Sequence, residues 1–150
     1  MIAFLPKFTL KYREVVWTLF STGMRTSEYI EEGTCRWTLL PDRIHVAGSK
    51  TPSADRIFPR IESSVKHHIH HRSCAQVLAR VTSRQYEPRD LRRSYARLLA
   101  DAGILEYRQA AYMGHAARTM TVHYQVGRIE PFLQADAVRI RELIAQPKLC

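Results

Sequence analysis

The sequence predicts an α+β fold that is mainly helical and carries a small three-stranded antiparallel sheet. Apolar residues recur at the spacing of a helix face in the segments 9–21 and 88–103. Between these segments lie three short runs, 35–40, 43–48 and 55–61, separated by the turn sequences "PD" and "SKTPSA". Helices that flank a short meander indicate an α+β arrangement.

The first helix is expected over residues 9–21, where five apolar side chains fall near one stripe. These are Leu10, Val15, Val16, Leu19 and Phe20. The "TG" pair at 22–23 breaks this helix. A second, short helix is expected from about Thr26 to Glu32, and Gly33 ends it.

The three strand-like runs are expected to pair in sequence order. Pro59 lies inside the third run and lacks an N–H to donate, so this run is predicted to be an edge strand. Residues 62–82 are expected to be helical.

Residues 88–103 give the clearest helical pattern in the chain. Pro88 suits a first helical position, and Gly103 suits the end. The apolar stripe consists of Leu91, Tyr95, Leu98 and Leu99. A short helix at about 105–113 and a last one at about 131–145 complete the expected elements.

Length and composition are those of one globular domain, predicted to span residues 1–150. An apolar fraction of 45% supports a buried core. No apolar stretch is long enough to span a bilayer, and the N-terminus has no secretory-signal pattern. The cysteines, Cys35, Cys74 and Cys150, are odd in number and lack CxxC spacing, which favours a reduced protein without a disulfide framework.

The charge balance predicts a polyanionic partner, most often nucleic acid. There are 23 Lys and Arg residues against 14 Asp and Glu, a net charge of +9. Arginine supplies most of the excess, and a planar guanidinium can grip two phosphate oxygens at once. The alternative is a soluble basic protein without such a partner.

The run "KHHIHHRSC" at 66–74 raises the possibility of a metal site. His67 and His71 are four residues apart and would share a helical face, as zinc ligands do. However, there is no HExxH motif and no acidic residue in the run, which favours a weakly basic, partly exposed helix without metal. No GxxxxGK[ST] or GxGxxG motif occurs, so a nucleotide cofactor is not expected.

Two short motifs carry candidate polar residues in the first half of the chain. In "TGMRTSE", Arg25 and Glu28 are three apart and would be neighbours on a helical turn; the alternative is an ordinary solvated pair. In "GSKTPS", Lys50 lies at a tight turn between two strands. It is either surface decoration or a mobile ammonium that reaches into a DNA groove.

Two further motifs lie in the second half. In "PRDLRRS", Arg89 and Arg92 fall in the first turn of a helix, where cations oppose the helix dipole unless an anion binds there. The alternative is that both arginines point to water. In "YMGHAARTMTVHY", Tyr124 follows His115 by nine residues.

In this order and spacing, the motifs resemble the catalytic domain of the tyrosine recombinases, the phage-integrase family. The family pattern is TGxRxxE, a hairpin lysine, HxLRHxxAxxLxxxG, LGH, and a tyrosine nine residues past that histidine. The resemblance runs from about residue 8 to residue 130. It implies a tyrosine-recombinase-like catalytic domain without the N-terminal core-binding domain of the family.

The resemblance also implies a role for each candidate residue. Arg25 and Arg92 would clamp the scissile phosphate, Lys50 would be the hairpin lysine, His115 the histidine of the GH motif and Tyr124 the nucleophile, while Glu28 would support the arginine network. Arg89 stands where the family usually has histidine; it is a poor base but can still hydrogen-bond phosphate.

The implied reaction is strand cleavage and rejoining through a 3′-phosphotyrosine link, without metal, nucleotide or other cofactor. The implied partners are double-stranded DNA and further copies of the chain in an oligomer on that DNA, with no membrane. The implied location is the cytoplasm of a bacterium or archaeon. Two alternatives stay open: a non-catalytic DNA-binding remnant of an integrase, and DNA relaxation of the type IB topoisomerase kind.

Overall fold

The structure is a computed structural model and describes residues 2–31, 36–48, 54–61, 65–115 and 129–145. It is mainly helical with one three-stranded antiparallel sheet, which confirms the predicted fold class. The helices are η1 (Ile2–Lys7), α1 (Leu10–Thr22), α2 (Thr26–Tyr29), α3 (His71–Val81), α4 (Pro88–Asp101), α5 (Glu106–Met113), η3 (Glu130–Phe132) and α7 (Leu133–Ala145). The strands are β1 (Arg36–Leu39), β2 (Arg43–Ala47) and β3 (Arg56–Pro59). The 3-10 helix η1 was not predicted, whereas η3 overlaps the start of the last helix, which is expected from about residue 131.

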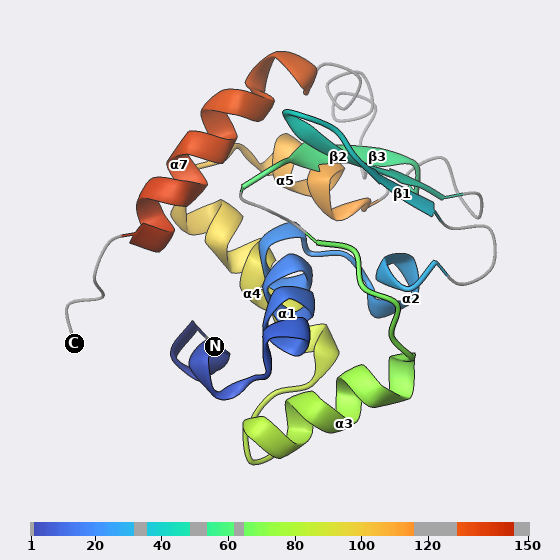
Figure 1. The fold of residues 1–150 in the computed structure, drawn as a ribbon. Helices are drawn as coiled ribbons and strands as arrows, with labels where there is room; N and C mark the ends of the chain where they lie inside the picture. The colour runs from blue at the N-terminus through green and yellow to red at the C-terminus, as the bar shows by residue number, and fades with distance from the viewer. Residues whose placement is uncertain (1, 32–35, 49–53, 62–64, 116–128, 146–150) are drawn as a thin grey trace.

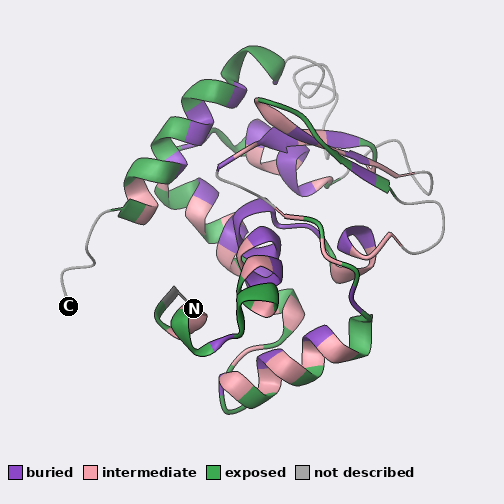
Figure 2. Cartoon of the chain, in the orientation of Figure 1, coloured by how far each residue is buried: buried purple, intermediate pink, exposed green. Residues whose placement is uncertain are grey.

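The helices α1 and α4 pack together at the centre of the molecule (Figure 1). The sheet lies at one end with α5 and α7 packed on β3, and α3 lies at the opposite end. Buried residues line the inner sides of these elements, as Figure 2 shows. The fold brings four segments toward one region: the loop after α1, the start of β3, the first turns of α4 and the C-terminal end of α5.

The α1 stripe is confirmed at four of its five positions and wrong at one. Val15, Val16, Leu19 and Phe20 are buried, whereas Leu10 is 67% exposed. At about 100° per residue, Leu10 lies about 180° from Leu19 and so faces the opposite side of the helix.

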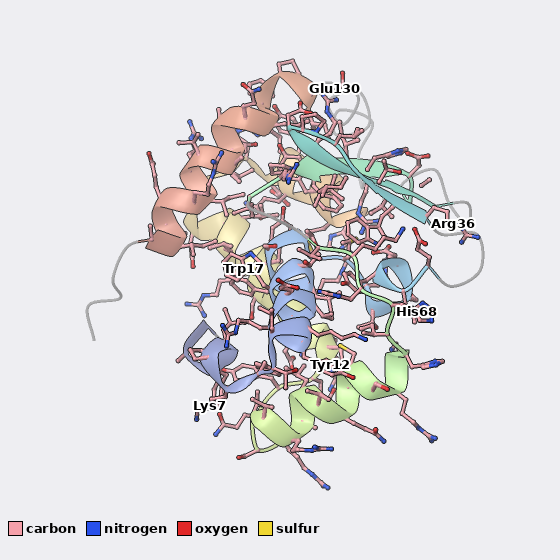
Figure 3. The ribbon with its side chains drawn as sticks, viewed as in Figure 1. Lys7, Tyr12, Trp17, Arg36, His68 and Glu130 are labelled. Atoms are coloured by element: carbon pink, nitrogen blue, oxygen red, sulfur yellow. The ribbon has the colours of Figure 1, made fainter. Side chains whose placement is uncertain are left out.

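The sheet follows the predicted meander, with strand order β1-β2-β3. Trp37 pairs with Val46, Ile44 pairs with Phe58, and all four side chains are buried. Strand β3 is at the edge, as its proline predicts. The carboxylate of Glu130, just before α7 (Figure 3), accepts a hydrogen bond of 2.5 Å from Arg43 on β2.

The helix predicted over 62–82 is wrong in its first part. Residues 65–70 are not helical, and α3 begins only at His71. Tertiary contacts hold this segment instead: the Tyr29 hydroxyl donates to the carbonyl of Val65 (2.9 Å) and accepts from the N–H of His67 (3.0 Å). His67 also contacts Glu14, at 2.5 Å.

Because His67 is outside the helix, it shares no helical face with His71. Within the described ranges no group of histidines, cysteines and carboxylates is arranged to hold a metal ion. Within the same ranges no helix has the length and apolar character needed to cross a membrane.

The other helices lie where the sequence predicts them. Pro88 is the first residue of α4, and Leu91, Tyr95 and Leu99 on that helix are buried, while Leu98 is only partly buried. Gly103 adopts a φ of 67° just after the helix. Helix α2 is shorter than expected and ends at Tyr29; Gly33 lies outside the described residues.

Candidate functional site

The "TG" turn after α1 sets the position of the next residues. Gly23 has a φ of 62° and donates its N–H to the carbonyl of Leu19 (3.0 Å). A Cβ at this position would lie 2.3 Å from Cδ1 of Tyr95, whose ring is buried on α4. Glycine is therefore required both by the left-handed backbone and by the close approach of α4.

Arg25 leaves this turn at the start of α2 and is held by Glu28. The Arg25 backbone N–H donates to Oε2 of Glu28 (2.7 Å), and its Nη1 donates to Oε1 (2.7 Å). The Arg25 side chain is 50% exposed, whereas that of Glu28 is buried. The predicted pair exists, but its carboxylate is buried instead of solvated.

A third residue, Arg56 at the start of β3, completes this network. Its Nη1 and Nη2 donate to Oε1 (3.0 Å) and Oε2 (2.8 Å) of Glu28, which is a bidentate pair. Burial by itself raises the pKa of Glu28, but the hydrogen bonds and charge of Arg56, together with the bonds from Arg25, hold it below its usual value.

Sequence reasoning missed Arg56. The signal that could have found it is its spacing, because it lies two residues before the buried Phe58 on the same strand. A charged residue in phase with the apolar, inward face of a predicted strand indicates a buried ionic contact.

Arg92 joins the cluster from α4. Its Nη1 donates to the carbonyl of Gly23 (2.6 Å), and its Nη2 donates to the carbonyl of Met113. Burial, followed by the neighbouring charges of Arg25 and Arg56, lowers the pKa of Arg92 to about 10. Arg92 therefore lies close enough to both cations to be repelled by them.

The end of α5 is attached to the cluster by two consecutive carbonyls. Tyr112 accepts from Nε of Arg56 (3.1 Å), and Met113 accepts from Arg92. Cations at a helix C-terminus are favourable because the carbonyl ends carry partial negative charge. Gly114 then adopts a φ of 62°, and the N–H of His115 bonds the carbonyl of Ala110 (2.9 Å). His115 is exposed and lies two residues after the anchored carbonyl of Met113.

Arg89 is not part of this arrangement. It is 69% exposed and pairs with Glu87 at 2.9 Å, at the entrance to α4. The sequence suggests that an external anion relieves the helix dipole here, but the carboxylates of Glu87 and Asp90 already lie at this end, and Asp90 accepts the N–H of Glu87 (2.8 Å). Arg89 and Arg92 thus have different partners in the structure, Glu87 for one and the carbonyls of Gly23 and Met113 for the other.

The remaining two predicted residues, Lys50 and Tyr124, lie outside the described residues. The structure thus brings together Arg25, Glu28 and Arg92, adds Arg56, and leaves His115 at the edge of the group.

The cluster holds three guanidiniums and one carboxylate, so positive charge exceeds negative charge by two. Such an excess in a partly dehydrated site favours an anion. Arg25 has half of its side chain in solvent and Arg92 is partly buried, and a guanidinium binds the oxygens of a phosphate through two parallel bonds.

A second buried arginine lies between α5 and α7. Arg108 contacts Asp136 (3.1 Å), which also accepts the hydroxyl hydrogen of Tyr112 (2.7 Å). The ring of Phe132 lies 4.4 Å from the Arg108 guanidinium. Burial and the Asp136 carboxylate raise the pKa of Tyr112.

Comparison of the chain with protein-family models, with curated proteins and with solved structures found no match.

Proposed function

We propose that this chain binds double-stranded DNA and cleaves and rejoins its strands in the manner of a tyrosine recombinase. One observation carries the proposal: Arg25 and Arg92, from distant parts of the chain, meet through the Gly23 turn in a cluster with excess positive charge. The order of the sequence motifs supports the same conclusion. A phosphodiester is an anion that fits both the charge of the cluster and the order of the motifs.

In this proposal the phosphate lies between the exposed sides of Arg25 and Arg92. Charge grows on its non-bridging oxygens in the transition state, and fixed guanidiniums stabilise that charge without a metal. Glu28 keeps Arg25 in place through two hydrogen bonds. The proposed site therefore supplies electrostatic stabilisation from groups that are already oriented.

The covalent step is assigned to Tyr124 by the resemblance. Its phenol gives up its proton to solvent as the oxygen attacks phosphorus, and the bond to the 5′ oxygen breaks. Lys50 gives that oxygen a proton, so the products are a 3′-phosphotyrosine and a free 5′ hydroxyl. Attack by a second 5′ hydroxyl reverses the chemistry and joins a new strand. We place His115 beside the same phosphate.

Site-specific exchange in this proposal takes place in an oligomer assembled on DNA, in the cytoplasm of a bacterium or archaeon. No cofactor enters the reaction. Dependence on a defined pair of sites distinguishes this activity from DNA relaxation of the type IB topoisomerase kind, which uses the same tyrosine chemistry on any duplex.

The test is covalent trapping on a duplex that carries a nick next to the cleaved phosphate, so that the released fragment diffuses away. Wild-type chain should give a protein–DNA band that survives denaturation. Tyr124→Phe should give none while keeping DNA affinity, because it loses only the phenol oxygen. A band of equal strength in Tyr124→Phe would remove Tyr124 from this role.

A non-catalytic DNA-binding protein is the second candidate, and the position of Arg89 favours it. The family usually has histidine there, whereas Arg89 pairs with Glu87 and is mostly exposed. DNA binding without any covalent band in wild-type chain would favour this candidate.

A further inference from the structure

We infer that Arg56 is a positioning residue of the proposed site, which holds Arg25 and the end of α5 in the arrangement that the phosphate requires. The inference rests on the proposed function and assigns a residue that the motifs do not include.

Arg56 is almost fully buried and its donors are directed inward. Four hydrogen bonds leave it: two to Glu28, one to the carbonyl of Tyr112 and one to the carbonyl of Ala54 (3.3 Å). A guanidinium has five N–H groups, so nearly all of them are used within the protein. Arg56 therefore acts on the phosphate through its neighbours and does not contact it.

The first of these neighbours is Arg25. Oε1 of Glu28 accepts from Nη1 of both Arg25 and Arg56, at 2.7 and 3.0 Å. Because Glu28 is buried and held on both oxygens by Arg56, its orientation depends on that residue. The orientation of Arg25, which has half of its side chain in solvent, depends in turn on Glu28.

The second neighbour is the end of α5. Arg56 bonds the carbonyl of Tyr112 and Arg92 bonds that of Met113, so adjacent peptide groups are fixed by the two arginines. His115 lies two residues after Met113. One side chain on β3 thus connects the turn that bears Arg25 with the helix end that contacts Arg92.

Lysine cannot make this connection. Its ammonium is a single point on a flexible stem, whereas the planar fork of arginine reaches both oxygens of a carboxylate and a carbonyl at once. Arg56→Lys therefore keeps the positive charge but cannot bond both Glu28 oxygens and the Tyr112 carbonyl at once. Arg108→Lys is the matched control, because Arg108 is equally buried and ion-paired but contacts neither Arg25 nor Glu28.

The experiment is a double-mutant cycle with wild-type chain, Arg56→Lys, Arg25→Ala and the double variant. Covalent trapping on nicked duplex is measured over a range of DNA concentrations up to saturation. The temperature is kept below the thermal unfolding midpoint of every variant. Arg56→Lys should lower the maximal rate about 10–100-fold with the half-saturating DNA concentration changed less than about threefold. The fold-decrease in maximal rate caused by Arg25→Ala should be at least about tenfold smaller in the Arg56→Lys background than in wild type. Arg108→Lys should leave the rate within about threefold.

Equal effects of Arg25→Ala in the two backgrounds would overturn the inference, as would equal losses of rate in Arg56→Lys and Arg108→Lys. If wild-type chain forms no adduct, the proposed cleavage fails, and the same four proteins are compared by affinity for an intact duplex. Coupling of about threefold or more between Arg56 and Arg25 in affinity would then support the positioning role at a phosphate-binding site, and additive effects would overturn it.

Discussion

The two buried arginine sites of this molecule contain the same residue types but differ in net charge. Around Arg108, one guanidinium meets one carboxylate, and the charges balance. Around Glu28, one carboxylate is surrounded by Arg25, Arg56 and Arg92, and the charges do not balance. Both sites contain buried, ion-paired arginine, so the unmatched charge is the feature that separates the proposed binding site from the Arg108 pair.

Exposure separates the two sites as well. Arg108 and Asp136 are both buried, so no ligand reaches them. In the other cluster Arg25 has half of its side chain in solvent, and Arg92 is only partly buried. The balanced pair joins α5 to α7, and the unbalanced cluster presents cations at the surface.

The largest expected effect concerns the balanced site. Asp136→Leu should lower the free energy of unfolding by about 3–5 kcal/mol, because it leaves the Arg108 charge buried without its partner. Urea denaturation measures this change. Gln134→Leu, at an exposed position two residues earlier, is the control and should change it by less than about 0.5 kcal/mol. If Asp136→Leu lowers the unfolding free energy as little as this control, the Arg108–Asp136 pair contributes little to stability.

The next effect concerns catalysis at the unbalanced site. Arg25→Ala and Arg92→Ala should each raise the barrier to covalent trapping by about 3–4 kcal/mol, because in the proposed mechanism each removes a donor to the transition-state oxygens. DNA affinity should fall less, since many phosphate contacts share the binding. The control is Arg93→Ala, next to Arg92 but 71% exposed. Losses of rate and affinity that match would mark Arg25 and Arg92 as ordinary backbone contacts.

The third effect concerns Glu28, whose contribution to the unfolding free energy should depend on pH. Glu28→Gln should cost about 1.5–3 kcal/mol of unfolding free energy at neutral pH, the value of a hydrogen bond to a charged group. The pKa of Glu28 is lowered in the folded state, so its contribution is complete above the ordinary value of 4.5 and is lost as pH falls through the lower folded pKa. Unfolding measured from pH 3 to 7 should show wild type and Glu28→Gln converging in acid. A constant difference across this range would contradict the assignment.

The smallest effect is expected outside both sites. Arg89→Ala should change the unfolding free energy and the barrier to trapping by less than about 1 kcal/mol each, because the Arg89–Glu87 pair is exposed. Thermal unfolding and single-turnover trapping measure the two quantities. A rate loss as large as that of Arg92→Ala would place Arg89 in the phosphate clamp after all.

Periodicity and turn residues were sufficient to predict α1, α4, α5, α7 and the three-stranded meander. These elements depend on local spacing of apolar residues and on glycine and proline positions, which the chain carries in short windows. The same information was insufficient for 65–70, where hydrogen bonds to Tyr29 replace those of a helix. The partners of that segment lie more than 30 residues away.

The candidate site divides in the same way. The sequence by itself determined which residues have the chemistry for a phosphate and that Gly23 permits the turn before Arg25. Only the tertiary structure decided that Arg92 meets this turn and that Arg56 holds Glu28. The physical reason is that a residue's type and neighbours fix its charge and local backbone. Its partners across the molecule depend on how helices and strands pack, and no local pattern contains that information.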